Sequence, residues 1–215
     1  LCNPNHVGHS SAIDMAFNFG GAMLDTLWME AGEAPIATFQ NISDEFAPYS
    51  VGVLTEPVNN DPVIEAMGGQ LVIARATALG NNDCFASLST TLNDVTYGFG
   101  NGAENAAIAG HADMPGLFPL RTPSSDTSVA VLTPCGFAGV DGAPWQWWNN
   151  TVYGMQAAGY NASNPNPEIA GIDAATWGCL ATIENTDMSE EKGLAFCDML
   201  EEFFAPRVEA ALNWD

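Results

Sequence analysis

The stretch Met15–Tyr49, MAFNFGGAMLDTLWMEAGEAPIATFQNISDEFAPY, decides the fold of this chain. It holds two short apolar runs, Met15–Phe19 and Pro35–Phe39, and each run is followed by turn residues. Runs of this length predict buried β-strands. Between them, Asp25–Ala31 predicts a short helix, with Gly32 just past its end. Strands that alternate with helices favour a parallel sheet covered by helices.

Further elements follow this stretch along the chain. Residues 51–66 hold two apolar segments around an Asn-Asn-Asp-Pro turn, which predicts a hairpin or a pair of extended segments. Gln70–Leu79 has helical spacing and ends before Gly80, a good C-cap residue. Cys84–Leu88 is predicted to be a third strand. The sequence therefore predicts the α/β class, with a mostly parallel sheet, helices on its faces and a helical C-terminal tail.

The last part of the chain predicts a long loop and then helices. Residues 121–143 are rich in Pro, Ser, Thr and Gly, and Pro144 is placed to open a helix. Asp187–Glu190 fits a D-x-x-E capping box. The helix after it is predicted to break or restart at Pro206 and to bury one face, formed by Leu194, Cys197, Leu200 and Phe204. We divide the chain into residues 1–120, the sheet core, and residues 121–215, a loop excursion and helical tail on the same domain.

Composition excludes several classes of function. The chain has 215 residues, of which 47% are hydrophobic, and this is enough for a buried core. It carries 26 acidic residues against 4 basic ones, a net charge of −22. Nucleic acids and anionic membranes are bound by clustered Lys and Arg, so neither is expected as a partner. No apolar run is long enough to span a bilayer, and no signal peptide is recognised. The acidity favours solubility through self-repulsion or a saline habitat.

The cysteines suggest an oxidising compartment. None of them forms a CxxC pair, which disfavours zinc ribbons and thioredoxin-like motifs. Scattered cysteines are typical of disulfides, so we expect a secreted protein, extracellular or periplasmic. Cys179 and Cys197 flank the entry to the last helix and are the favoured pair. One cysteine is left over and is free or bonded to another chain, for which Cys2 is the candidate; the remaining two are Cys84 and Cys135.

Asp44 and His111 are the candidate catalytic residues. Asp44 follows the strand Pro35–Phe39, and His111 ends a Gly- and Asn-rich loop that follows the predicted strand Cys84–Leu88. In α/β-hydrolases the catalytic residues come in the order Ser, Asp or Glu, and His. The carboxylate accepts a hydrogen bond from one imidazole nitrogen, so that the other can take the proton of the serine hydroxyl. Loops at the carboxyl ends of parallel strands bring such residues together.

Asp25–Pro35, the acid loop around Asp44 and the histidine loop Ile108–His111 together resemble secreted bacterial α/β-hydrolases of the esterase, lipase or polyesterase kind. The acid loop of that family reads H-G-T-x-D-x-x-V-P-Y, and this chain keeps its Asp, Pro and Tyr. The histidine loop of the family reads G-x-G-H, and this chain has lost one of the two glycines. The resemblance covers residues 15–120 and 144–212, the tail included, and the acid loop departs from the family at Gln40, Asn41, Ile42 and Ala47.

The resemblance implies that this chain is the C-terminal part of an α/β-hydrolase. In the family the nucleophile elbow and the oxyanion-hole loop precede the strand aligned to Met15–Phe19, so they would lie upstream of Leu1. The sheet would then have an open edge, and we expect the N-terminal half, a second polypeptide or self-association to cover it. Gly8–Ala12 matches G-x-S-x-A, but Asn3–Val7 before it is no core strand, so Ser10 is the less favoured nucleophile.

Other polar and aromatic groups have simpler explanations. His6 and His9 offer two metal ligands without a third, so no metal site is predicted. Asn59–Asp61 and Asn81–Asp83 lack EF-hand spacing and are better explained as turns. No nucleotide-binding motif occurs, and no cofactor is expected. For the tryptophans, packing is favoured over an aromatic wall for a substrate; they are Trp145, Trp147 and Trp148. N-x-S/T triplets, which matter only in a source that glycosylates its secreted proteins, begin at Asn41, Asn149 and Asn161.

Two functions remain open. The first is carboxylic-ester hydrolysis through an acyl-enzyme, with His111 as base and then acid, Asp44 as its orienting group, and a serine from the missing half. The second is a non-catalytic, hydrolase-derived subunit of an extracellular assembly or filament. The altered acid loop at residues 40–42, the absent elbow and the open sheet edge favour the second.

Overall fold

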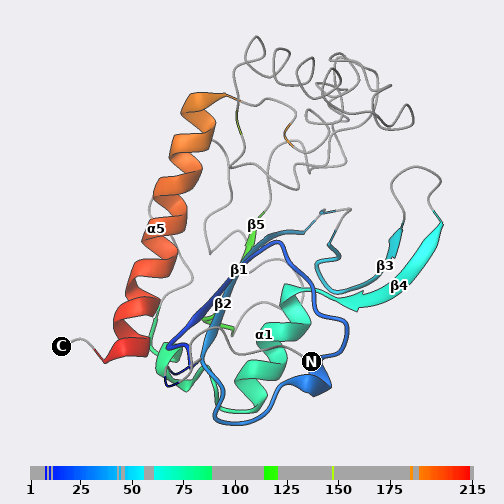
Figure 1. The fold of residues 1–215 in the computed structure, drawn as a ribbon. Helices are drawn as coiled ribbons and strands as arrows, with labels where there is room; N and C mark the ends of the chain where they lie inside the picture. Colours follow the sequence, from blue (N-terminus) through cyan, green and yellow to red (C-terminus); the bar gives the residue numbers. More distant parts are fainter. Residues whose placement is uncertain are drawn as a thin grey trace.

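The structure is a computed structural model that describes residues 12–42, 47–55, 61–88, 114–120 and 189–213, together with Gly8, Ser10, Asp44, Trp147 and Asn185. Two helices, α1 and α5, lie on either side of a small sheet, and a hairpin projects to one side (Figure 1). The elements in chain order are β1 (Ala16–Phe19), η1 (Thr26–Trp28), β2 (Ile36–Asn41), β3 (Val51–Thr55), β4 (Pro62–Met67), α1 (Gly69–Ala78), η2 (Asp83–Phe85), β5 (Leu117–Leu120) and α5 (Glu190–Leu212).

The main sheet is parallel and has the strand order β1-β2-β5. Ala16 pairs with Ile36 at one end of β1, and Asn41 pairs with Leu120 at the end of β5. Parallel pairing requires a crossover between neighbouring strands, as the strand and helix order predicted. The α/β class with a parallel sheet is therefore confirmed for the described part of the chain.

One face of the sheet packs against α5 through a cluster of aromatic rings. Phe39 of β2 stacks on Phe118 of β5 with ring centroids 4.4 Å apart. Phe196 and Phe203 of α5 meet the Phe39 ring edge-on, at 5.1 Å and 5.7 Å. All four side chains are fully buried. These rings form the centre of the core, because aromatic side chains bury large apolar areas in edge-to-face contacts.

The strand β1 lies at an edge of this sheet, and it is less buried than the sequence predicted. Phe17 and Phe19 are 43% and 46% exposed, although both contact the ring of Phe204 edge-on. The central strand β2, in contrast, is buried from Ala37 to Asn41. The short run at residues 15–19 was predicted to be a strand and is one, but only one side of it has a neighbouring strand among the described residues.

The opposite face of the sheet carries α1, as predicted. This helix spans Gly69–Ala78 and ends before Gly80, which has φ +77°. The buried side chains of Val72 and Ala76 pack against Met29 and Ile36. Positive φ favours glycine, so the turn that ends α1 is encoded directly by Gly80.

Two buried amides after α1 hold the chain segment that enters β2. Asn82 donates from Nδ2 to the carbonyl of Ile36 (3.0 Å) and accepts at Oδ1 from the Ile36 N–H (2.9 Å). Asn81 binds the N–H of Gly32 and the carbonyl of Glu30 in the same way, at 2.8 Å each. Residues 79–82 form the predicted turn, and the two amides use it to hold the segment that leads into β2.

The predicted third strand at Cys84–Leu88 is wrong. Residues 83–85 form a short 3-10 helix, which places the Phe85 ring in the core and leaves Cys84 exposed. The third strand is β5, which contains Pro119. The N–H of Thr38 donates to the carbonyl of Gly116, so the even-numbered residues of β2 form the hydrogen bonds to β5. In this register the Pro119 nitrogen faces away from β2. Proline is tolerated there because, among the described residues, β5 has a neighbouring strand on one side only.

The C-terminal helix α5 begins two residues later than the predicted cap at Asp187, and only part of its predicted face is buried: Phe204 lies in the core and Leu200 packs against it. Its N-cap is Ser189, whose Oγ accepts from the Lys192 N–H (3.1 Å), and Asp187 lies outside the described residues. The helix continues through Pro206. Of the predicted face, Leu194 is 57% exposed and Cys197 is exposed. The buried residues are Lys192, Gly193, Phe196, Met199, Phe203, Phe204 and Arg207.

Arg207 connects α5 to the turn before β5. Its guanidinium is buried, and it donates to the carbonyl of Pro115 from Nε (2.8 Å) and Nη2 and to that of Phe203 from Nη1 (2.6 Å). It also lies 3.5 Å from the centre of the Phe203 ring. Burial lowers the pKa of Arg207 to about 9, so the side chain is still a cation at neutral pH. This buried charge fixes the position of α5 relative to β5.

The two remaining elements agree with the sequence in part. The hairpin predicted at residues 51–66 is confirmed as β3 and β4, which are antiparallel from Val51, opposite Met67, to Thr55. The short helix predicted at residues 25–31 is reduced to the 3-10 turn η1, which Asp25 caps by accepting from the Leu27 N–H (2.8 Å). Among the described residues, none of the helices has the length and apolar character needed to cross a membrane.

Candidate functional site

The candidate site lies at the carboxyl edge of the parallel sheet. Asp44 follows β2 by a short turn, in which its N–H donates to the carbonyl of Asn41 (3.4 Å). Asn41 pairs with Leu120, so β2 and β5 end at the same edge. Residues that follow parallel strands at this edge are brought together, and ligands of α/β sheets bind there. The structure thus places Asp44 in the loop just past the carboxyl end of β2.

The carboxylate of Asp44 already has one partner within its own loop. Its Oδ1 accepts from the N–H of Ala47 at 3.0 Å, and the side chain is half-buried. This bond connects Asp44 to the backbone three residues further along the loop. Because a carboxylate has two oxygens and several lone pairs, such a bond leaves it able to accept from an imidazole as well.

Gln40 supports the acid loop through its side chain, a role that was not predicted from the sequence. Its side chain is fully buried. Nε2 donates to the carbonyls of Ala47 (2.9 Å) and Pro48 (3.3 Å), and Oε1 accepts from the Gly69 N–H (2.8 Å). One amide therefore joins the acid loop to the start of α1. The signal that could have revealed it is a lone glutamine at the end of an apolar strand.

Replacing Gln40 by leucine is expected to lower the free energy of unfolding by about 2–3 kcal/mol, because the buried groups that it binds in the acid loop and at Gly69 would lose their partner. Denaturant unfolding followed by circular dichroism measures this change. Gln70→Leu is the matched control, since the Gln70 side chain makes no hydrogen bond in the structure, and it should cost less than about 0.5 kcal/mol. Equal losses in both variants would contradict the supporting role of Gln40.

His111 lies outside the described residues, but the chain that follows it limits its reach. β5 begins at Leu117, level with Thr38, and a turn precedes it in which the Leu117 N–H donates to the Met114 carbonyl (2.8 Å). From Met114, the chain back to His111 can span at most about 11 Å. The carboxyl edge lies about 10 Å along the sheet from the level of Leu117. The chain that leads from His111 therefore enters β5 at the end of the sheet opposite Asp44.

Neither Ser10 nor Cys84 supplies a nucleophile at this edge. Ser10 is exposed, and its Oγ accepts from the Ala12 N–H at 3.0 Å. Ala12 precedes β1, and the chain enters β1 at the end of the sheet opposite Asp44. For the thiol of Cys84, burial and then the nearby Asp83 carboxylate raise the pKa, which disfavours the reactive thiolate.

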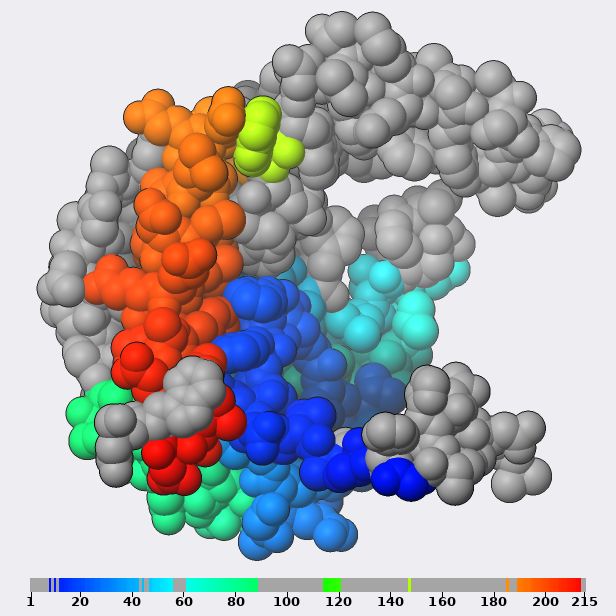
Figure 2. Space-filling model, turned by 60° about the vertical axis from the view of Figure 1, so that its left-hand side comes forward, coloured from blue at the N-terminus to red at the C-terminus, as the bar shows by residue number. Residues whose placement is uncertain are grey.

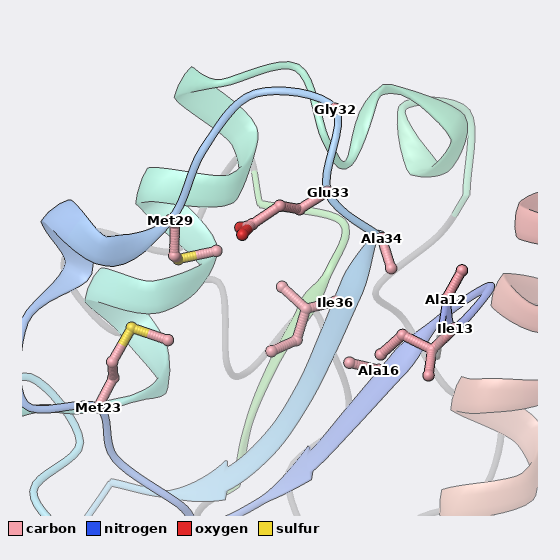
Figure 3. Close-up of a pocket in the computed structure, with 9 residues that line it drawn as sticks. All are labelled: Ala12, Ile13, Ala16, Met23, Met29, Gly32, Glu33, Ala34 and Ile36. Carbon is pink, nitrogen blue, oxygen red and sulfur yellow. The ribbon is translucent and has the colours of Figure 1, made fainter. Parts of the chain in front are cut away.

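A pocket of about 460 Å³ lies at the other end of the sheet, against its α1 face. Its walls come from the starts of β1 and β2 and from the segment between them, and the Glu33 side chain points across it toward Met29 (Figure 3). The walls are otherwise apolar, so the pocket has no partner for acyl-transfer chemistry. Within the described ranges, no three His, Cys, Asp or Glu side chains gather closely enough to hold a metal ion.

Several sequence predictions fall on residues outside the described part of the chain. These are His6 and His9, the turn at residues 59–60, the helix expected at Pro144, Trp145 and Trp148, the triplets at Asn149 and Asn161, and the cysteines Cys2, Cys135 and Cys179. Cys84 and Cys197, the cysteines that the structure describes, are exposed and have free thiols. Comparison with protein-family models, curated proteins and solved structures found no match to this chain.

Proposed function

We propose that this chain is the C-terminal portion of a serine hydrolase that cleaves carboxylic esters. The observation that supports this function is the position of Asp44, on a built loop just past the carboxyl end of the central parallel strand. Catalytic groups of α/β enzymes come from such loops. Gln40 holds this loop against α1, which gives the carboxylate a rigid support.

In this proposal the chain supplies two of the three catalytic groups. Asp44 orients the imidazole of His111 and stabilises the imidazolium that forms. His111 takes the proton of a serine hydroxyl as the serine attacks the ester carbonyl, and then gives that proton to the leaving alcohol. Water hydrolyses the acyl-enzyme in the second half of the reaction, with His111 again as base. The serine and the oxyanion hole come from an upstream segment or a second polypeptide.

A non-catalytic role is the second candidate, and the order of the residues favours it. All three histidines of the chain, at positions 6, 9 and 111, precede β5, and none follows it. A loop after β5 would emerge beside Asp44, whereas the chain that leads into β5 starts from the level of Thr38. In this alternative, the chain is a hydrolase-derived structural subunit of an extracellular assembly, and Asp44 only closes its turn.

The two candidates differ in whether a reactive serine exists. We expect a fluorophosphonate probe to label one serine in the native material, located by mass spectrometry of every polypeptide present. Asp44→Asn should slow labelling and ester hydrolysis about 10³–10⁴-fold, because the amide stabilises the wrong imidazole tautomer. Asp83→Asn, at an exposed turn, is the control and should leave both rates unchanged.

Each result of this experiment has a defined meaning. A labelled serine in an upstream segment or second chain, with a rate that depends on Asp44, supports the hydrolase. A label on Ser10 moves the nucleophile into this chain and contradicts the placement of the elbow upstream. The absence of any label, with only this chain in the sample, rules out the hydrolase and leaves the structural subunit.

We also propose that the protein is secreted, to the periplasm or outside the cell. The five cysteines and the excess of acidic residues support this location. The favoured disulfide between Cys179 and Cys197 would have to form from the thiol of Cys197, which is free in this structure. Non-reducing peptide mapping of the secreted material tests the pair directly, and it also shows whether Cys2 bonds to another chain.

A further inference from the structure

The pocket beside the starts of β1 and β2 has the size and the lining of a site for a small molecule. Its volume of about 460 Å³ lies within the range of about 300–1,000 Å³ that is usual for ligand pockets. Met23, Met29 and Ile36 line the pocket and also pack in the cluster of apolar side chains that includes Val72 and Ala76 of α1. The pocket therefore rests on buried core, and its apolar walls suit an apolar ligand body. In the space-filling view, the blue residues around β1 lie beside α5 (Figure 2).

The wall that carries Glu33 is held in place by two side-chain amides. Asn81 accepts from the Gly32 N–H at 2.8 Å, just before Glu33. Asn82 binds both backbone groups of Ile36, at 2.9 Å and 3.0 Å, just after it. The wall thus has a fixed shape before any ligand binds. A preorganised site of this kind loses less conformational entropy on binding.

Glu33 is the charged residue in the lining of this pocket. Its side chain points across the pocket toward Met29 (Figure 3). The carboxylate accepts one hydrogen bond, from the Glu30 N–H to Oε2 at 3.0 Å, and the described part of the chain places no cation within ion-pair distance of it. Residues 12–36 contain no Lys or Arg. Because Glu33 is exposed and a carboxylate has several lone pairs, a cationic group of a ligand can reach it and donate to it.

We propose that this pocket binds a small amphiphilic amine, a molecule with an apolar chain or ring and one ammonium group. The apolar body would lie against Met29 and Ile36, and the ammonium group would donate to the carboxylate of Glu33. Charge-assisted hydrogen bonds of this kind are stronger than neutral ones. A lysine of a second copy could not take this place, because Lys192, the one lysine of the chain, is fully buried.

This site is separate from the proposed ester site. The pocket lies at the end of the sheet where β1 and β2 begin, whereas Asp44 follows the end of β2. Binding of an amine therefore requires no ester hydrolysis. It goes beyond the proposed function, and it can be tested on this chain alone.

Calorimetric titration of the full chain with octylamine tests the proposal, with octanol and octanoate as ligands that share its apolar body. Octylamine is a cation at neutral pH, as the lysine side chain is. We expect saturable binding of octylamine, binding of octanol that is weaker by about tenfold or more, and no binding of octanoate, because like charges repel. Rising salt should weaken the binding of octylamine, because ions screen the attraction.

Glu33→Gln isolates the contribution of the carboxylate, since its amide oxygen can still accept from the Glu30 N–H. This variant should bind octylamine about tenfold more weakly, or worse, and octanol as the parent chain does. Glu30→Gln is the matched control, because it removes the same charge from a side chain that does not line the pocket, and it should bind octylamine like the parent chain. Ala34→Phe, which places a ring in the pocket, should weaken the binding of both ligands, and circular dichroism checks that each variant is folded.

Equal binding of octylamine and octanol, equal binding of octylamine to the parent chain and to Glu33→Gln, or no saturable binding would overturn the proposal. Acetyl-lysine amide, with its free side-chain amine, presents the same ammonium group as a polypeptide would. We expect it to bind about tenfold more weakly than octylamine, because it has fewer methylene groups to bury. Tighter binding of this compound would assign the site to a lysine of another polypeptide and overturn the small-molecule proposal. Serine labelling is a separate readout, so failure of one proposal leaves the other testable.

Discussion

Replacing Phe39 by alanine is expected to lower the free energy of unfolding by about 3–5 kcal/mol, enough to unfold much of a marginally stable domain. Phe39 is fully buried at the centre of the sheet, and its ring contacts Phe118, Phe196 and Phe203. Removal of the ring leaves a cavity between β2, β5 and α5 that rigid strands cannot close. Chemical denaturation followed by tryptophan fluorescence measures the loss.

Phe17→Ala is the matched control for this experiment. Phe17 lies on the neighbouring strand and faces the same side, but 43% of it is exposed and it contacts one ring, that of Phe204. Its truncation should cost about 1 kcal/mol, since less apolar area is lost and solvent fills the gap. If the two variants lost similar stability, Phe39 would not be the centre of the core and the packing of α5 on this face would be wrong.

Gly68→Ala is expected to have the second-largest effect, a loss of free energy of unfolding of about 3 kcal/mol, at the upper end of the usual cost of overpacking. A Cβ at Gly68 would come closer than 3.0 Å to the backbone of Pro48 and Tyr49, and backbone cannot rotate away as a side chain can. The Gly68 N–H also donates to the carbonyl of Ser50 (2.5 Å). The substitution would push the acid loop away from the start of α1, so any esterase activity that depends on Asp44 should fall with stability.

Gly32→Ala separates this steric effect from the cost of backbone conformation. Gly32 has φ +88°, yet a Cβ there would meet no atom within 4 Å. Alanine at this position should therefore cost only about 1 kcal/mol, the penalty of a left-handed backbone. Thermal unfolding of the two variants side by side measures the difference. A smaller loss for Gly68→Ala than for Gly32→Ala would show that the acid loop does not pack against Gly68.

The sequence predicted those elements whose signal is local. The apolar runs of β1 and β2, the turn-separated hairpin and the helix before Gly80 were all found within a few residues of their predicted bounds. Each is specified by neighbouring residues: length and apolar content for a strand, φ +77° at Gly80 for a helix end. The parallel arrangement followed from the strand and helix order, because short crossovers cannot join parallel neighbours.

The predictions that failed concern elements whose structure depends on contacts between residues far apart in the sequence. Residues 84–88 have an apolar composition suited to a strand, but Phe85 alone enters the core, and the place beside β2 is taken by β5. Pro119 made that strand hard to predict, because a proline fits in a strand only where its nitrogen faces away from the neighbouring strand. The sequence does not show which side of β5 pairs with β2. On α5, apolar spacing favoured Leu194, whereas the buried face includes Arg207, whose partner at Pro115 is 92 residues away. The apolar periodicity of a helix cannot reveal a hydrogen-bond partner that is so distant in the sequence.

The candidate site could be predicted only as far as its loop position. Asp44 stands after β2 as the sequence predicted, because a strand followed by polar residues fixes where the loop begins. The support from Gln40 was not visible, since it depends on the Ala47 carbonyl and the Gly69 N–H being near each other in space. The pairing of Asp44 with His111 stays a prediction, and the turn at Met114 sets the distance that it must bridge.

The buried Arg207 has a consequence for the order in which the chain folds. Residues 12–88 can form β1, β2, the hairpin and α1 through contacts that are comparatively close in the sequence. Phe39 becomes fully buried only when β5 and α5 pack against it. The hydrogen bond between Arg207 and Pro115, which are 92 residues apart, joins these two elements. Contacts between distant residues form slowly, because long loops must close first. During synthesis the aromatic face of β2 therefore stays uncovered until the last helix has left the ribosome, a period in which a chaperone would protect it.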